Sequence, residues 1–217
     1  MVTRHPGTEI SRLRERQHRD RESLDAVLDS TPLATVAFVR DGHPVALPTG
    51  FARLGDELVI HGSTGSPWLR ELAAGAPVSV AVTALDAILV ARSGFESSFH
   101  YRSAVIFGRF GVVGDDEKNR YLEDLTDAFI PGRVAELRPS TARELAATLV
   151  LRMRIGDDNW SVKIADGWPE DDEADVAAGG WAGVVPIVTT YGSPLRAPDC
   201  DPGTALPESV RSMTGGR

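Results

Sequence analysis

Cysteine is nearly absent from this chain, which has one such residue, Cys200, among 217. A single cysteine excludes an intramolecular disulfide and any thiolate metal cluster within one chain. Long apolar runs are also missing, since none approaches the roughly 20 residues that a membrane-spanning helix needs. The first residues lack the hydrophobic region of a signal peptide. We therefore expect a soluble, cytoplasmic protein without a membrane partner, whose fold depends on packing.

Positive charge is scarce and is not concentrated in one segment. Lysine and arginine number 23 against 31 aspartate and glutamate residues, which gives a net charge of −8. Arginines and histidines gather between Arg4 and Arg21, but Glu9, Glu15 and Asp20 are interleaved with them, as on a solvated helix face or a frayed end. An acidic protein repels a phosphate backbone at long range, so nucleic acid is not an expected partner.

Several catalytic motifs are missing as well. The sequence contains no HExxH, CxxC, GxGxxG or GxSxG pattern, so zinc-protease, thiol-redox, Rossmann and α/β-hydrolase chemistry have no motif to support them. No metal site is expected. This absence suits a protein whose reactive group is a bound cofactor, with the polypeptide supplying orientation and electrostatics.

The patterns that are present predict a mainly β (α+β) protein. With 42% hydrophobic residues, the chain can bury the core of one domain. β-rich segments dominate, and Asp41-Gly42 is typical of a type I′ hairpin between two of them. Because few helices separate the strands, an antiparallel barrel is favoured over a parallel sheet. Strands are expected at 33–40, 43–53, 57–61, 77–92 (with a break near Leu85 and Asp86), 101–114, 148–155 and 160–165, and helices at 20–30, 67–75, 115–130 and 139–147.

The two ends of the chain differ from this central part. We expect an N-terminal arm over 1–19, a domain over 20–189 and a tail rich in proline and glycine over 190–217. The segment from Trp168 to Gly180 is acidic and reads as an exposed connector. The tail lacks hydrophobic periodicity, so most of it is expected to be mobile unless it docks on a partner.

The clearest local signal for a site is the strand, turn and helix start from His61 to Arg70. Backbone amides and the dipole at a helix start attract anions, so phosphate is a natural ligand there. Ser63, Thr64 and Ser66 add hydroxyl groups, and Arg70 adds charge if its side chain turns back to the first turn. The alternative is that Ser66 simply caps a helix that begins at Pro67.

Two further clusters carry aromatic and polar groups. In the segment from Ser97 to Ser103, Arg102 can grip a phosphate or carboxylate with two hydrogen bonds; the alternative is a polar surface loop. Trp181 lies among small residues after the acidic connector. It could stack on a flat ring, although an anchor in the core is the more ordinary role of such a tryptophan.

Taken in order, LATVAFVRDGHPVALPTGFARLGDELVIHGSTGSPWLRELAAGAPVSVAVT, then LDAILVARSGFESSFHYRSAVIFGR and WAGVVPI, resemble the flavin-nucleotide-binding branch of the pyridoxamine 5′-phosphate oxidase-like superfamily. That branch includes the nitroimidazole-resistance proteins. The resemblance spans roughly Asp20 to Val188. It implies a six-stranded antiparallel split β-barrel with a few peripheral helices, and a homodimer that binds FMN at the interface.

The resemblance also implies which residues contact the cofactor. The strand Pro48-Thr49-Gly50-Phe51 would run along the flavin ring, and His61, Gly62 and Ser63 would border the ring or the ribityl chain. Tyr101, Arg102 and Ser103 would reach across from the second subunit, and Trp181 would approach the ring. Ser66, Pro67 and Trp68 occupy the phosphate position, where related oxidases often have basic residues after the serine; the charge would then come from Arg70 or Arg102.

The function implied is FMN-dependent redox chemistry on an unidentified small molecule, with His61 as the candidate acid or base. A structural role for His61 is the alternative. The C-terminal residues of a true pyridoxamine phosphate oxidase are not recognisable, so vitamin B6 synthesis is not predicted. A second hypothesis is a non-catalytic protein that binds or stores FMN, haem or the deazaflavin F420. In the haem case His61 or His100 would be a candidate axial ligand.

Overall fold

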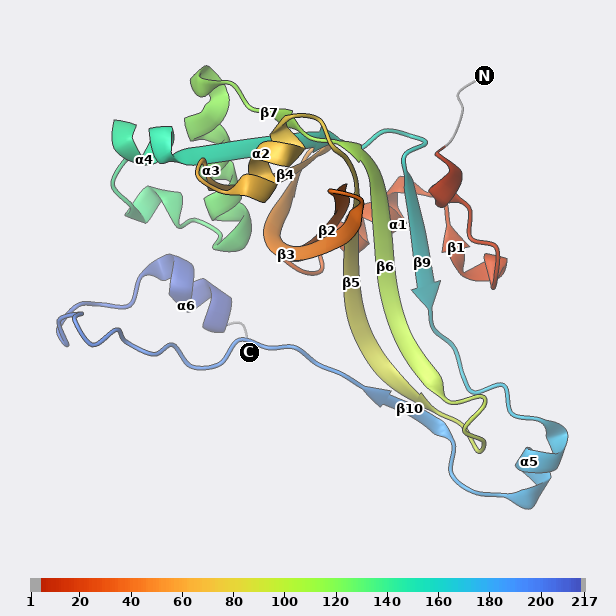
Figure 1. The fold of residues 1–217 in the computed structure, drawn as a ribbon. Coiled ribbons are helices and arrows are strands. Elements are labelled where there is room, and N and C mark those ends of the chain that lie inside the picture. Colours follow the sequence, from red (N-terminus) through yellow and green to blue (C-terminus); the bar gives the residue numbers. More distant parts are fainter. Residues whose placement is uncertain (1–4, 216–217) are drawn as a thin grey trace.

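The computed structural model describes residues 5–215 and consists mainly of antiparallel strands (Figure 1). Within this range one ten-stranded sheet runs in the order β1-β9-β6-β5-β2-β3-β4-β8-β7, with β10 paired to β5. The expected mainly β fold of split-barrel type is confirmed, although the short strands β1, β7 and β10 extend the sheet beyond six strands. The strands are β1 (Gln17–His18), β2 (Leu33–Arg40), β3 (His43–Leu54), β4 (Glu57–Ser63), β5 (Pro77–Val90), β6 (Ser98–Arg109), β7 (Gly111–Val112), β8 (Thr148–Arg154), β9 (Trp160–Ala165) and β10 (Gly183–Pro186).

The helices are short, and those expected from the sequence form where their caps place them. Asp20 accepts a hydrogen bond from Ser23 N at the start of α1, and Thr141 and Glu144 form a reciprocal capping box at the start of α4. None of the helices between residues 5 and 215 is long and apolar enough to cross a bilayer. The helical elements are η1 (Pro6–Thr8), η2 (Arg14–Arg16), α1 (Arg21–Leu28), α2 (Pro67–Ala73), α3 (Asp115–Phe129), η3 (Val134–Glu136), α4 (Ala142–Ala147), α5 (Glu173–Ala178) and α6 (Glu208–Thr214).

The β2–β3 hairpin turns at Asp41 and Gly42, whose φ angles of 50° and 77° are those of the expected type I′ turn. The prediction that the strand breaks near Leu85 and Asp86 is wrong. β5 continues through both residues, and Asp86 is a bulge that shifts the register with β6 between Leu85 and Ala87. A bulge bends a strand without ending its pairing. β5 and β6 therefore form one long ribbon that projects beyond the barrel (Figure 1).

Two apolar layers hold the barrel together. The interior contains buried side chains from the strands, such as Val36, Phe51 and Ile106, and α1 and α2 add Leu24 and Leu69 to it. Each fully buried side chain of this size contributes about 1.5–3 kcal/mol to the free energy of unfolding. This layer fixes which strand residues point inward, and therefore which ones point outward toward the site.

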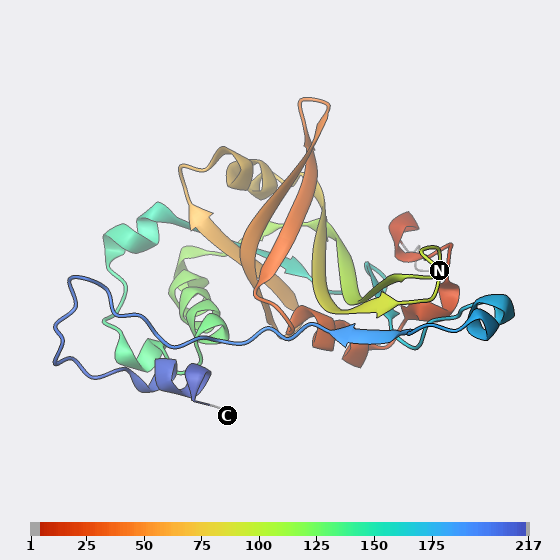
Figure 2. The ribbon, with the colours of Figure 1, turned by 90° about the horizontal axis from the view of Figure 1, so that it is seen from below.

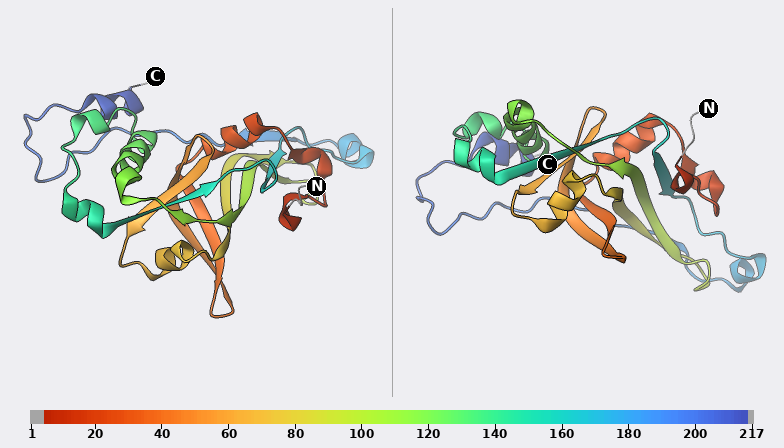
Figure 3. Two further views of the ribbon diagram at one scale, coloured as in Figure 1. Left: turned by 90° about the horizontal axis from the view of Figure 1, so that it is seen from above. Right: turned by 45° about the horizontal axis from the view of Figure 1, so that its top comes forward.

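The second layer lies outside the barrel, where α3 covers β3, β4 and β8 (Figure 3). Tyr121 and Leu125 of α3 pack with Ala52, Val59 and Val150. A polar tie reinforces this contact, because the Tyr121 hydroxyl donates to Glu57 and accepts a bond of 2.7 Å from Arg152. α3 is thus held at a fixed position over the outer face of the barrel.

After β10 an extended segment, residues 187–207, crosses back along the molecule to α6 near η3 (Figure 2); we call it the strap. At one end Ile187 N donates to the Asp86 carbonyl at 2.8 Å. At the other end the amide and hydroxyl of Ser209 in α6 both donate to the Glu136 carboxylate. We expected the tail to be mobile unless it docks on a partner. In the structure it is bound to the rest of its own chain at both ends of the strap. At the opposite terminus β1 pairs with β9, and residues 1–4 of the expected arm, like residues 216–217 of the tail, lie outside the described range.

Candidate functional site

The outer face of β3 and β4 is covered by α3 along only part of its length. Ala52 pairs with Val59 under α3. Side chains two positions apart on a strand share a face. Gly50 and His61 therefore lie on the same outer face as Ala52 and Val59, two residues away on each strand. A Cβ atom on Gly50 would lie 3.5 Å from the Phe129 ring at the end of α3. Beyond this contact, the face at His61 opens toward the space that the Phe129 ring also lines.

A cavity of about 580 Å³ lies at this opening, between β4, α3, η3 and α4; we call it the β4–α3 cavity. Most of its wall area is apolar, although six of its twelve lining residues are polar. Two of the polar residues, Arg138 and Glu144, are joined by an ion pair of 2.6 Å. Apolar walls with polar groups placed among them are typical of a site for an organic ligand. Its lining is His61, Leu122, Leu125, Thr126, Phe129, Ile130, Leu137, Arg138, Ser140, Glu144, Leu145 and Thr148.

His61 is the only imidazole among the residues that line this cavity. Part of its surface is open to solvent, yet desolvation by the surrounding protein lowers the pKa of the ring below its usual value of 6.5. The ring makes no hydrogen bond with any residue that the structure describes. A neutral imidazole with an unused lone pair can accept a proton or bind a metal ion. The geometry is therefore compatible with either role that the sequence analysis gave to His61.

The turn between β4 and α2 uses its amides internally. Thr64 N donates to the Ala147 carbonyl at 2.9 Å, Gly65 N to Ser63 Oγ at 3.1 Å, and Ser66 N to the Ser63 carbonyl at 2.9 Å. Ser66 is the N-cap residue, but its hydroxyl makes no capping bond. The three turn amides are thus already bonded, whereas no hydrogen bond from Ser66 caps the first amides of α2, which stay available to an anion.

Arg70 provides positive charge at this turn. Its guanidinium turns back and donates to the Gly65 carbonyl at 2.8 Å, which is the orientation that the phosphate prediction required. No carboxylate pairs with it within residues 5–215. A guanidinium bonded only to a carbonyl keeps its full charge and several free N–H groups for an anion.

Other predicted contact residues on β3, β4 and α2 differ in orientation. The side chain of Phe51, 1% exposed, and that of Trp68 pack into the interior. Gly62 also faces inward, because a Cβ atom there would lie 2.6 Å from Leu69. Pro48, Thr49, Ser63 and Pro67 remain at least partly exposed. Phe51, Gly62 and Trp68 can therefore offer only backbone groups to a ligand on the outer face.

The predicted residues on β6 do not share one face. Tyr101 and Ser103 point outward, whereas Arg102 alternates to the other side and donates two hydrogen bonds, of 3.0 and 2.9 Å, to the Asp86 carboxylate. β6 lies across β5, β2 and β3 from β4. The structure therefore does not bring these three residues to the β4–α3 cavity of their own chain.

Trp181 lies just before β10 and is 67% exposed. The interpretation of this residue as an anchor in the core is therefore wrong, because its ring packs only over nearby backbone at Gly183. β10, which follows Trp181, begins opposite Val90 at the end of β5 and lies away from α3 and α4 (Figure 1). Its proposed approach to a cofactor ring would have to take place in another copy of the chain.

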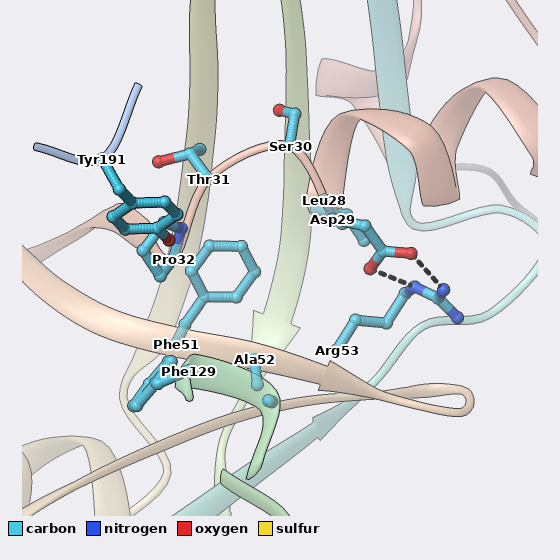
Figure 4. Close-up of a pocket in the computed structure, with 11 residues that line it drawn as sticks. Leu28, Asp29, Ser30, Thr31, Pro32, Phe51, Ala52, Arg53, Phe129 and Tyr191 are labelled. Atoms are coloured by element: carbon cyan, nitrogen blue, oxygen red, sulfur yellow. Dashed lines mark hydrogen bonds and ion pairs between the residues drawn. The ribbon is translucent and has the colours of Figure 1, made fainter. Parts of the chain in front are cut away.

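A second cavity of about 410 Å³ lies between the α1–β2 link, β3, the end of α3 and the strap (Figure 4). Tyr191 of the strap lies over Pro32 at one side of the cavity. At the other side Arg53 forms a two-bond ion pair with Asp29. Phe129 lines this cavity as well as the β4–α3 cavity. One aromatic side chain therefore separates two cavities on neighbouring sides of the barrel.

The sequence analysis missed most of the cavity walls. Phe129, Leu137 and Leu145 lie in segments that were correctly predicted as helices or links but given no role. The apolar stripe of α3 was the available signal, but periodicity alone does not tell which apolar residues fill a core and which line a cavity. Lys163, the outward-pointing cation nearest to Tyr101, was also missed.

Comparison with known proteins places this geometry in context. The family model described as pyridoxamine 5′-phosphate oxidase matches residues 20–160. The FAD and haem binding protein from Mycobacterium smegmatis is 68% identical, with a TM-score of 0.91 over 92% of this chain and 97% of that one. The flavocytochrome Anf3 from Azotobacter vinelandii is 33% identical, with a TM-score of 0.89 over 96% of this chain and 97% of that one.

A more distant structure shares the fold alone. It is a proposed 5-nitroimidazole antibiotic resistance protein from Bacteroides thetaiotaomicron, which is 14% identical, with a TM-score of 0.58 over 68% of this chain and 86% of that one. A search of curated proteins finds no match.

Proposed function

Because this chain belongs to the flavin-binding pyridoxamine 5′-phosphate oxidase family, we propose that it is a flavin-dependent redox protein acting on a small molecule. The observation that carries this proposal is the β4–α3 cavity, in which His61 lies against apolar walls, together with Arg70 on the helix that follows the same strand. Flat apolar walls suit a flavin ring, and an uncompensated guanidinium suits its phosphate.

The residues of this surface have separate tasks in the proposal. Leu122, Phe129 and Leu145 exclude water from one side of the ring. Gly50 allows close approach of the β3 backbone, and Arg70 binds the phosphate. A bound flavin supplies transfer of hydride or single electrons, chemistry that no side chain of the cavity performs. His61 accepts or returns a proton at an imidazole nitrogen, which its lowered pKa leaves unprotonated near neutral pH.

The flavin nucleotide is FMN or FAD. The family resemblance implies FMN, whereas the relative that is 68% identical is named for FAD. Both nucleotides contain the same ring, ribityl chain and first phosphate, so the contacts proposed above serve either. The name of that relative favours FAD, and a direct titration with both nucleotides separates them.

A second copy of the chain is the proposed partner. Ile88 of β5 pairs with Phe99 of β6 on one side and with Val185 of β10 on the other, and all three side chains are exposed. Leu33 and Leu85 extend this apolar face, which we call the outer sheet face. Exposed apolar side chains grouped in this way are typical of an interface. Leu33 pairs with Gly50, so a copy on this face would border the β4–α3 cavity.

We also propose haem as a second cofactor, because the two relatives above 30% identity are named for haem or as a flavocytochrome. Two imidazoles are candidate axial ligands, and His61 is one of them only where haem takes the place of the flavin ring in the β4–α3 cavity. His61 lines the β4–α3 cavity, and desolvation lowers the pKa of its ring, which favours the neutral form that binds a metal ion. His100 Nε2 is buried and has no hydrogen-bond partner among residues 5–215, a situation that a metal ion would relieve. His61→Ala and His100→Ala, compared by the intensity of the Soret band, identify the ligand.

The spectrum of the purified protein tests the proposal directly. We expect flavin absorption bands, and on titration with FMN and FAD we expect saturation near one flavin per chain. Addition of haemin should produce a Soret band. No binding of either flavin at micromolar concentration contradicts the proposed function, and the deazaflavin F420 and haem alone would then be tested in its place.

A storage or sensing role without turnover is the second candidate. The flavin-loaded protein separates the two: reduction by NADH or NADPH, followed by reoxidation with an added acceptor over repeated cycles, supports a redox enzyme. Stoichiometric flavin binding without reduction by any donor supports a binding protein.

A further inference from the structure

Lys163 lies on the outward side of β9. It pairs in register with Ser103 of β6, and its ammonium group lies 5.8 Å from the centre of the Tyr101 ring. Its neighbours along the strand, Val162 and Ile164, belong to the interior layer. The alternation of a strand therefore fixes the Lys163 side chain on the outer sheet face.

The charge of this lysine has no counterion. No carboxylate lies within ion-pair distance of Lys163 anywhere in the part of the chain that the structure describes, although the protein carries a net charge of −8. Lys118, the chain's other lysine, pairs with Asp115 at 2.6 Å. Arg102 on the neighbouring strand is paired with Asp86. A half-buried cation is costly when unpaired, so an anion from outside the chain would stabilise it.

Lys163 is not among the residues that line the β4–α3 cavity of its own chain. In the hydrogen-bonded order of the sheet, β6, β5, β2 and β3 lie between β9 and β4. Lys163 shares the outer sheet face with Leu33, which pairs with Gly50 next to the cavity. A second copy seated on this face would therefore carry its Lys163 toward the cavity of the first copy.

We propose that Lys163 of one copy binds the phosphate of the flavin nucleotide whose ring occupies the β4–α3 cavity of the other copy. The proposal deepens the proposed function and rests on it. Arg70 contacts the phosphate from the chain that holds the ring, and Lys163 contacts it from the partner. In a twofold dimer the same contact occurs twice. Lys163 thus has the role that the sequence analysis gave to Arg102, which is to contact the cofactor from the second subunit.

The test compares three ligands that share one ring: riboflavin, which has no phosphate, FMN and FAD. For Lys163→Gln we expect Kd to rise about tenfold for FMN and FAD, the size of one charged contact, and to change less than twofold for riboflavin. Lys163→Arg should restore most of the affinity. Arg154→Gln, which removes an exposed cation outside the lining of the β4–α3 cavity, is the control. Equal weakening of all three ligands, or no change in any, overturns the proposal.

Mixed dimers test whether Lys163 acts across the interface. One chain carries Gly50→Leu, which fills its own cavity, and the other carries Lys163→Gln. The second chain keeps an open cavity and receives Lys163 from the first. We expect one FMN per dimer with the affinity of the unmodified protein. Weak binding at that single site shows that Lys163 acts within its own chain and overturns the proposal.

Failure of the proposed function gives a different result from failure of this inference. If the unmodified protein binds none of the three ligands, the flavin site itself is wrong. If it binds FMN and FAD normally and Lys163→Gln binds them equally well, only the role of Lys163 is wrong. The oligomeric state of each variant, measured by light scattering, shows whether a change in affinity follows from loss of the dimer.

Discussion

Leu33 pairs with Gly50 across β2 and β3, and this one position of the register joins two surfaces of the molecule. Leu33 belongs to the outer sheet face, whereas Gly50 faces the Phe129 ring beside the β4–α3 cavity. A partner that covers the first surface therefore borders the second. Ligand binding and dimer formation should influence each other for this reason, and the predictions below examine each separately.

Gly50→Leu should abolish flavin binding without unfolding the protein. A Cβ atom at Gly50 meets the Phe129 ring at an ordinary contact distance, so the backbone tolerates it. The remaining atoms of leucine should displace that ring, which lines the β4–α3 cavity with His61, into the cavity. We expect Kd for FMN and FAD to rise at least tenfold, as measured by quenching of flavin fluorescence. Gly192→Leu, on an open part of the strap, is the control. Unchanged affinity in Gly50→Leu would place the flavin elsewhere.

His61→Gln should reduce turnover more than flavin binding. The glutamine keeps a polar side chain in the cavity but cannot accept a proton near neutral pH. We expect the rate of flavin reduction or reoxidation to fall by about 10²-fold, the lower range for loss of a general acid or base, with Kd changed less than threefold. His43→Gln, at the exposed β2–β3 hairpin, is the control. Equal loss of binding and turnover contradicts the catalytic role.

The lowered pKa of His61 also predicts a pH dependence of stability. Because the folded state holds this ring neutral, the unfolded state binds the proton more readily below about pH 6.5. The stabilising contribution is full above the unfolded pKa and is lost as the pH falls through the folded pKa. Urea unfolding at pH 7.5 and pH 5 measures it. The difference between the two pH values should shrink in His61→Gln, and an unchanged difference assigns it to other groups.

Ile88→Asp should convert the dimer to a monomer. The charge would lie between the exposed side chains of Phe99 and Val185, where a partner would have to bury it. Size-exclusion chromatography with light scattering measures the mass directly. Val112→Asp, which places a charge on β7 away from this face, should leave the mass unchanged. A monomeric unmodified protein contradicts the homodimer.

Ser209→Ala should release the C-terminal end of the strap. Both polar groups of Ser209 donate to Glu136, and these bonds lower the pKa of that carboxyl group. Loss of the hydroxyl bond weakens the docking of α6, so limited proteolysis of the strap should become several-fold faster. Ser212→Ala, whose hydroxyl bonds only within α6, is the control. Equal cleavage rates in the two variants would show that packing holds α6.

The sequence predicts those parts of the molecule whose signals are local. The Asp41-Gly42 hairpin and the Thr141 cap depend on neighbouring residues and form as expected. The orientation of Arg70 toward its own first turn is local as well. The cavity is different, because its floor at His61 and its roof at Phe129 and Leu145 come from segments far apart in the chain. Only the packing of α3 on the barrel brings them together.

The same limit applies to the predicted residues on β6 and to Trp181. A composition rich in polar and aromatic groups suggested one cluster at Tyr101, Arg102 and Ser103, but strand alternation divides it between two faces. The partner of Arg102 is a bulge residue on another strand, Asp86. Lys163 escaped notice because it lies in an apolar strand about 60 residues further along, and only the register with Ser103 relates it to the cluster.

The two anchors of the strap have a consequence for the chain after cleavage. β10 is hydrogen-bonded to β5, and α6 is bonded to Glu136, so neither end depends on the residues between them. A single nick at an exposed residue such as Leu195 would leave both pieces bound. The nicked protein would elute at its original size on a native column and separate into two fragments only under denaturing conditions.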